Sequence, residues 1–225
     1  MPSPASLWTA EAIAVFVKDW RCELRTRYAL NTLGLFSFTT LVMVSVGLGP
    51  LGSMGLTVLP VILWVILLFS VSAGLPRAFV HEEETRTATA LRLAATPSAL
   101  FCGKLLYGLT LVLALEALVT PLFLVLSDLT VKSPGTLVAV LAAGGYGLAA
   151  GSTLVAAIIA QAQGKGTLFA VLSFPVLLPL LLIAVELTRN AVGGDPAGVA
   201  LAQLLLYDAM VTVAGLMLFP AVWNP

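Results

Sequence analysis

Two carboxylic acids lie inside long apolar stretches of this 225-residue chain, and they are the first candidates for chemistry. Glu116 is about halfway along one stretch, and Asp208 is about halfway along another. A carboxylate at the centre of a bilayer costs about 2.5–3.5 kcal/mol on insertion scales, so such an acid indicates a function by default. It could belong to a proton or substrate path, or it could hydrogen-bond a neighbouring helix. The sequence leaves both interpretations open.

A second group of charged side chains lies in the longest loop of the chain, residues 76–104. Three acids near its start and Arg92 near its end suit the macrodipole of a short helix. We expect that helix to end before Pro97, because a residue that precedes proline is pushed out of the α region. The helix is either a solvated connector or a surface that a partner protein grips. The charged residues are Glu82, Glu83, Glu84, Arg86 and Arg92.

Motifs for other kinds of chemistry are missing from the sequence. The pair Gly164-Lys165 lacks both the first glycine and the final Ser or Thr of a P-loop, so we expect no ATP hydrolysis by this chain. The lone His81 and the isolated Cys22 and Cys102 do not form a metal or haem ligand set. No nucleophile and base can be paired. We therefore predict neither an enzyme nor a bound metal or cofactor.

The composition indicates the environment that must hold these side chains. Hydrophobic residues make up 60% of the chain and charged residues 10%, with a mean hydropathy of +1.06. Soluble domains carry about 25% charged residues, so a soluble fold is excluded. The formal net charge of zero gives no sign of nucleic-acid binding. Because the apolar stretches are continuous rather than alternating, we expect an all-α integral membrane protein with one domain, residues 1–225.

Six apolar stretches are long enough for helical spans of about 20 residues. In the fourth, Gly147 and Gly151 permit close helix contact, which we expect within one chain rather than between two copies. In the fifth, Pro175 and Pro179 are one turn apart, so we expect that span to be bent or broken. The expected spans are residues 29–48, 54–75, 105–126, 137–160, 167–187 and 199–220.

The distribution of Lys and Arg predicts the orientation of the spans. Nine of these residues fall on one side of the six expected spans, and only Lys132 and Arg189 fall on the other. Because positive charge concentrates in cytoplasmic loops, we expect both termini in the cytoplasm.

Residues 1–28 form an amphipathic segment ahead of the first span. Apolar residues recur at helical spacing on one face, and Arg21 and Arg25 lie on another. We expect this helix to lie in the cytoplasmic interface with its apolar face toward the lipid. It is either a membrane anchor or an elbow helix that leads into a transporter's first span. The apolar positions are Ile13, Phe16, Val17, Trp20 and Leu24.

Short motifs along nearly the whole chain resemble the CcmB family, the permease subunits of the ABC system for cytochrome c maturation. The likeness rests on the order and spacing of several pieces taken together. They are Phe16-x-x-Asp19-x-Arg21-x-x-x-Arg25, Leu59-Pro60-x-x-x-Trp64-Val65, Arg77-x-Phe79 with Glu82-Glu83-Glu84, Ala95-Thr96-Pro97, Gly103-Lys104-Leu105, Lys165-Gly166 and Phe174-Pro175-Val176-Leu177-Leu178-Pro179-Leu180.

This resemblance implies an ABC-2 or type V exporter-like permease in the bacterial inner membrane. The segment 82–92 would be the coupling helix that fits a groove on the ATPase CcmA, which binds ATP and Mg²⁺. Two copies of the chain would pair with two copies of CcmA, beside CcmC and CcmD, with the haem chaperone CcmE as client. The elbow helix would contain Phe16, Asp19, Trp20, Arg21 and Arg25.

Three functions compete on this sequence. The chain could couple ATP hydrolysis by its partner to haem delivery and release of the loaded chaperone. It could instead export haem or another small molecule directly, with Glu116 and Asp208 on the path, or act as a proton-coupled secondary carrier. We favour coupling, because the spans offer no haem ligand. The unequal halves of the chain argue against a carrier built from inverted repeats.

Overall fold

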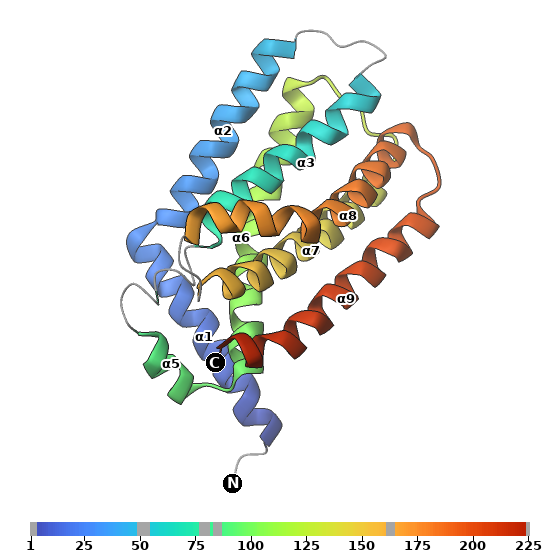
Figure 1. The fold of residues 1–225 in the computed structure, drawn as a ribbon. Coiled ribbons are helices and arrows are strands. Elements are labelled where there is room, and N and C mark those ends of the chain that lie inside the picture. Colours follow the sequence, from blue (N-terminus) through green and yellow to red (C-terminus); the bar gives the residue numbers. More distant parts are fainter. Residues whose placement is uncertain (1–3, 49–54, 77–81, 83–86, 161–164, 224–225) are drawn as a thin grey trace.

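The computed structural model describes residues 4–48, 55–76, 82, 87–160 and 165–223, and all regular structure in them is helical (Figure 1). Six of the helices are long and apolar enough to cross a membrane. The expected all-α, multi-pass membrane protein is therefore confirmed. The helices are α1 (Pro4–Thr26), α2 (Tyr28–Leu48), α3 (Gly55–Gly74), α5 (Ala88–Ala94), α6 (Pro97–Leu126), α7 (Pro134–Ala160), α8 (Lys165–Gly193) and α9 (Gly198–Trp223).

α6 and α8 exceed the apolar stretches that predict them by the largest margin. α6 has 30 residues and, at about 1.5 Å per residue, exceeds the roughly 30 Å hydrocarbon core, because it starts at Pro97. α8 continues as one helix through Pro175 and Pro179. Figure 1 shows α8 changing direction along its length, so this span is bent and not broken. Proline is a common cause of such kinks.

α7 is the central helix of the bundle and packs against α6, α8 and α9. Its glycines make these contacts close. A Cβ atom at Gly147 would lie 2.4 Å from a methyl carbon of Leu180, and one at Gly151 would lie 2.5 Å from Leu177. Both leucines belong to α8. The pair of glycines thus serves helix packing within one chain, as predicted.

α1 runs alongside the first half of α6, in the same direction. Trp8 Nε1 donates to Ser98 Oγ at 3.0 Å, and Trp20 Nε1 donates to Thr110 Oγ1 at 3.0 Å. Between these contacts, Gly103 of α6 brings the two backbones together, because its Cβ position is 2.6 Å from the carbonyl oxygen of Ala12. α1 therefore extends the bundle at the end where α6 begins.

The face of α1 that packs on α6 differs from its apolar stripe. The buried residues are Ala12, Val15, Asp19 and Glu23, whereas Ile13 is 57% exposed. The predicted apolar stripe is thus divided: Ile13 and Leu24 are exposed on the outside of the protein, whereas Phe16 and Trp20 are partly buried against the core. α1 has a third face, which the sequence pattern did not reveal and which carries two carboxylates into the protein.

Both ends of the described chain lie at the same end of the bundle (Figure 1). Phe219 near the end of α9 packs on Phe101 near the start of α6, with 5.5 Å between ring centroids. At the opposite end, Ser133 N–H donates to the carbonyl of Ala191 at 2.9 Å, which brings the α6–α7 loop to the end of α8. We call the first of these the terminal end of the bundle.

Candidate functional site

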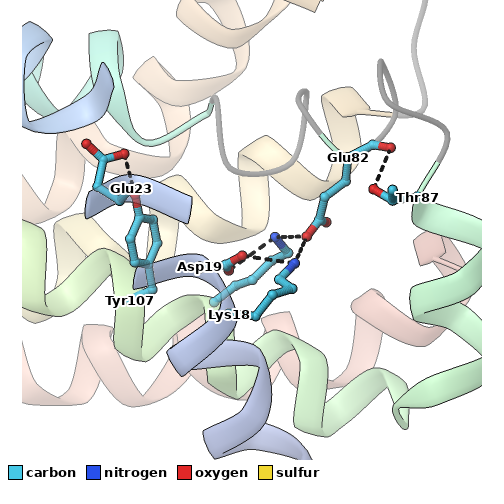
Figure 2. Close-up of polar contacts among 7 residues, drawn as sticks. Lys18, Asp19, Glu23, Glu82, Thr87 and Tyr107 are labelled. Atoms are coloured by element: carbon cyan, nitrogen blue, oxygen red, sulfur yellow. Dashed lines mark hydrogen bonds and ion pairs between the residues drawn. The ribbon is translucent and has the colours of Figure 1, made fainter. Parts of the chain in front are cut away.

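Four charged side chains from three parts of the chain meet at the terminal end of the bundle (Figure 2). Lys104 Nζ of α6 lies 3.0 Å from Glu82 Oε1 and 3.4 Å from Asp19 Oδ2. Lys18 Nζ lies 2.9 Å from Asp19 Oδ1 and also pairs with Glu82. We call Lys18, Asp19, Glu82 and Lys104 the ionic cluster. It joins α1 and α6 to the segment between α3 and α6.

The ionic cluster is largely withdrawn from solvent. The side chain of Lys104 is 1% exposed and that of Glu82 is 6% exposed, whereas Lys18 at 42% reaches the surface. Burial alone lowers the pKa of Lys18, but the carboxylates of Asp19 and Glu82 outweigh this effect and hold that pKa above its usual value. The two carboxylates therefore favour the protonated, charged form of Lys18.

Glu82 also contacts the start of α5. Its backbone carbonyl accepts the N–H of Thr87 at 3.0 Å, and Thr87 immediately precedes α5 (Figure 2). The carboxylate of Glu82 is thus turned into the protein while its backbone lies next to the short helix. This side chain is 6% exposed and lies between Lys18 and Lys104.

The same segment is held a second time, after α5. Glu11 Oε2 on α1 accepts the Thr96 N–H at 2.9 Å and the Thr96 hydroxyl at 2.8 Å. The backbone hydrogen bond, helped by the hydroxyl, lowers the pKa of Glu11. We call residues 75–96, which include α5, the connector. α1 therefore contacts the connector on both sides of α5.

Glu23 fixes the junction between α1 and α2. Its Oε1 accepts the N–H of Leu30 at 2.8 Å in the first turn of α2, and its Oε2 accepts the Tyr107 hydroxyl of α6 at 3.2 Å. A carboxylate in this position satisfies a free N–H at a helix start and suits the helix dipole. Between the helices, Arg27 has a φ of 51°, a left-handed conformation uncommon for a residue with a side chain.

A pocket of about 730 Å³ lies beside the ionic cluster. α5 contributes apolar side chains to it, including Leu91, and the facing wall includes Tyr28 of α2 and Gly74 of α3. Lys18, Asp19 and Glu82 also line it. Open volume thus separates α5 from the start of α2 and the end of α3. The residues on either side of α5 are nevertheless fastened to α1.

The two acids of the membrane-spanning helices lie against the central helix. Glu116 of α6 and Asp208 of α9 are each 4% exposed, and their carboxylate oxygens accept no hydrogen bond from any described residue. A Cβ atom at Gly145 would lie 2.7 Å from both Glu116 oxygens, and one at Gly147 would lie 2.3 Å from Asp208 Oδ1. The two acids therefore contact α7 at neighbouring positions, and glycine makes room for each.

The remaining predicted site residues are divided between the surface and the undescribed part of the chain. Arg21 and Arg25 are exposed on α1, whereas Phe16 and Trp20 are partly buried. Arg92 belongs to α5. Glu83, Glu84 and Arg86 lie outside the described residues. The short helix that we expected before Pro97 is seen as α5, Ala88–Ala94, within the described residues.

Sequence reasoning missed the partners that hold the connector. Lys18 and Lys104 are 64 and 22 residues from Glu82 in the chain, and Glu11 is 85 residues from Thr96. The available signal was a lysine at the start of an apolar stretch, since a buried cation calls for a carboxylate. Asp19, named only as part of the elbow motif, turns out to be one of these carboxylates.

Comparison with known proteins gives a match over nearly the whole of this fold. The family model of the CcmB protein matches residues 10–222. The chain belongs to the CcmB family. The region shared with the CcmB family takes in the ionic cluster, the connector and both buried acids. A relative, heme exporter protein B of Bradyrhizobium diazoefficiens, is 27% identical over 187 residues, which cover 80% of this chain and 82% of the relative.

Proposed function

We propose that this chain is the permease subunit of an ABC-type complex for cytochrome c maturation, in a bacterial inner membrane. It couples ATP hydrolysis on the partner ATPase CcmA to haem delivery and to release of the haem-loaded chaperone CcmE. Membership of the CcmB family and the name of the Bradyrhizobium relative support a role in haem handling. Two copies of the chain, with CcmC and CcmD, complete the complex. ATP and Mg²⁺ bind to the partner.

The observation that carries the coupling function is the attachment of the connector. A partner that pushes on α5 acts on a segment whose Glu82 is bound to α1 and α6 through buried ion pairs. Motion at the connector then reaches a membrane-spanning helix directly. In the proposed orientation, the terminal end of the bundle faces the cytoplasm, where ATP is available.

The experiment that tests this function is purification of the tagged chain from its native membrane in a mild detergent. We expect a soluble protein with a Walker motif and a haem-containing membrane protein to co-purify. An ATPase without a haem partner would keep the permease and remove the cytochrome role. A well-folded sample without any ATPase would contradict the proposal and favour the proton-coupled carrier.

Docking of CcmA is tested by reversing the charges of Glu83 and Glu84. Glu82 is left unchanged in this test, because its side chain is paired with Lys18 and Lys104. We expect E83K/E84K to abolish ATP-dependent release of the chaperone while the complex still assembles. Normal release in this variant would contradict the assignment of the connector as the coupling element.

Direct export of haem remains the second candidate, because the relative is named an exporter and two acids are buried within the spans. Neutral substitutions separate the two functions. If coupling alone is required, E116Q and D208N should support normal cytochrome maturation when the variants fold. If the acids line a path, either substitution should block movement of the substrate and leave the assembled complex intact.

A further inference from the structure

α1 holds the connector on both sides of α5. Before α5, Glu82 pairs with Lys18, and after α5, Thr96 makes two hydrogen bonds to Glu11. Glu11 and Lys18 are seven residues apart, which is about two helical turns and about 10.5 Å along α1. Two fastenings at this separation oppose rotation of α5 about either one. A single contact would leave the connector free to pivot.

α1 is itself fixed to the first turns of α6. The close approach at Gly103, where a Cβ atom would meet both the Ala12 carbonyl oxygen and the Val15 side chain, leaves no room for one helix to slide past the other. Lys104, the next residue of α6, enters the ionic cluster. The connector, α1 and the start of α6 are thus joined in a closed set of contacts.

Another side of α5 borders a pocket. The pocket of about 730 Å³ lies between α5 and the region where the start of α2 adjoins the end of α3, with Leu91 on one wall and Gly74 on another. Apolar side chains across an open volume make fewer dispersion contacts than packed ones, so they resist relative movement less. α5 is therefore attached to α1 through its flanking residues Glu82 and Thr96, whereas the pocket separates it from parts of α2 and α3.

We propose that α1, α5 and the first turns of α6 form one lever that moves as a unit against α3 and the part of α2 beyond its first turn, with Glu82 and Glu11 as its two fastenings. Both are positioning residues, since they act through the helices that they join. The inference rests on the proposed function for the source of the force. It assigns α1 a part in transmission, in addition to any role as a membrane anchor.

Paired spin labels test the lever in the full-length chain, reconstituted in lipid nanodiscs. We place them at Arg21 of α1 and Leu93 of α5, as R21C/L93C in a C22S/C102S background, because Arg21 is exposed and Leu93 is 87% exposed. The distance distribution should be narrow, and E11Q/E82Q should broaden it at least twofold. E186Q is the matched control, since Glu186 is an exposed acid on α8, and it should leave the width unchanged.

The second arm measures the same pair in the ATPase-bearing complex with and without ATP. The distance from 21 to 93 should stay constant, whereas the distance from 93 to K132C, at the opposite end of the bundle, should change. An ATP-dependent change between 21 and 93 would overturn the lever.

An unchanged width in E11Q/E82Q would overturn the lever as well. If that double variant does not fold, E11Q alone leaves the ionic cluster intact and should still broaden the distribution, by a smaller factor. If no ATPase co-purifies, the proposed function fails. The width comparison in nanodiscs then still tests the two fastenings by themselves.

Discussion

Lys104 is a buried cation whose charge must be compensated by its neighbours. A cation that is 1% exposed costs several kcal/mol to bury unless carboxylates and hydrogen bonds compensate it. Glu82 at 3.0 Å is one compensating carboxylate, and Asp19 at 3.4 Å is a weaker one. The stability of the terminal end therefore depends on a residue from the connector, outside the membrane-spanning helices.

Replacing Glu82 with Gln should destabilise the chain by about 1.5–3 kcal/mol, the usual contribution of a hydrogen bond to a charged group. Asp19 stays in place, so Lys104 is not left wholly uncompensated. The measurement is the midpoint of reversible unfolding in mixed micelles. E186Q, at an exposed site, should change stability by less than about 0.5 kcal/mol. Equal midpoints for E82Q and E186Q would contradict this account of Lys104.

Lys18 predicts how stability depends on pH. Its pKa is raised in the folded protein, above the ordinary value of 10.5, so folding favours the protonated form. The contribution of Lys18 is therefore fully present below pH 10.5 and is lost as pH rises through the higher pKa of the folded state. The difference in stability between the native chain and K18Q should be constant near neutral pH and shrink in strong alkali. Growth of the difference with pH would contradict the sign.

For single residues, the sequence could identify candidates for a function but could not predict which of them contact each other. Glu116 and Asp208 stand out because charges are rare inside apolar stretches, and the structure buries both. The pairing of Glu82 with Lys104 could not be inferred, because no periodicity links a loop acid to a lysine on another helix. Only the packing of α1 on α6 brings their partner Asp19 to the same place.

Among the elements, the contact between α1 and α6 is the most sensitive to side-chain volume. In the variant G103A, the new methyl group would meet the backbone oxygen of Ala12 at 2.6 Å, and a backbone atom cannot turn aside as a side chain does. We expect a loss of about 1–3 kcal/mol from overpacking, measured as the shift in the unfolding midpoint.

Gly135 provides the control for this substitution, since it lies in the first turn of α7 and no atom is within 4 Å of its Cβ position. G135A should leave the midpoint unchanged or raise it slightly, because alanine is the better helix former. If G103A matched G135A, the two helices could not be as closely packed as the structure has them.

Hydropathy located the spans well, because length and apolarity alone decide what can cross a bilayer. The faces of α1 were harder to predict. Ile13 and Leu24 of its apolar stripe point outward, while Asp19 and Glu23 are buried. Amphipathic periodicity identifies the side that avoids water, but near a membrane that side can face lipid and leave a different side to face the protein.

For the whole molecule, the proposed orientation places the terminal end in the cytoplasm and the α6–α7 loop on the outer side. Cys22 is exposed on α1 and provides a native probe. A membrane-impermeant maleimide should label Cys22 in inverted membrane vesicles and not in intact spheroplasts. K132C, in a C22S/C102S background, should show the reverse pattern. Labelling of Cys22 from the outside would invert the topology and exclude a cytoplasmic ATPase at the connector.

The close contact between α1 and α6 also has a consequence for how the chain is made. α1 leaves the ribosome before α6, and two partners of its buried carboxylates, Lys104 and Tyr107, are synthesised 85 and 84 residues after Asp19 and Glu23. Glu23 can accept the Leu30 N–H as soon as α2 begins, but the contacts with Lys104 and Tyr107 can form only after α6 has been made. Biogenesis of this protein therefore includes a late docking step, in which α1 takes its final place against α6 only after the third span has been synthesised.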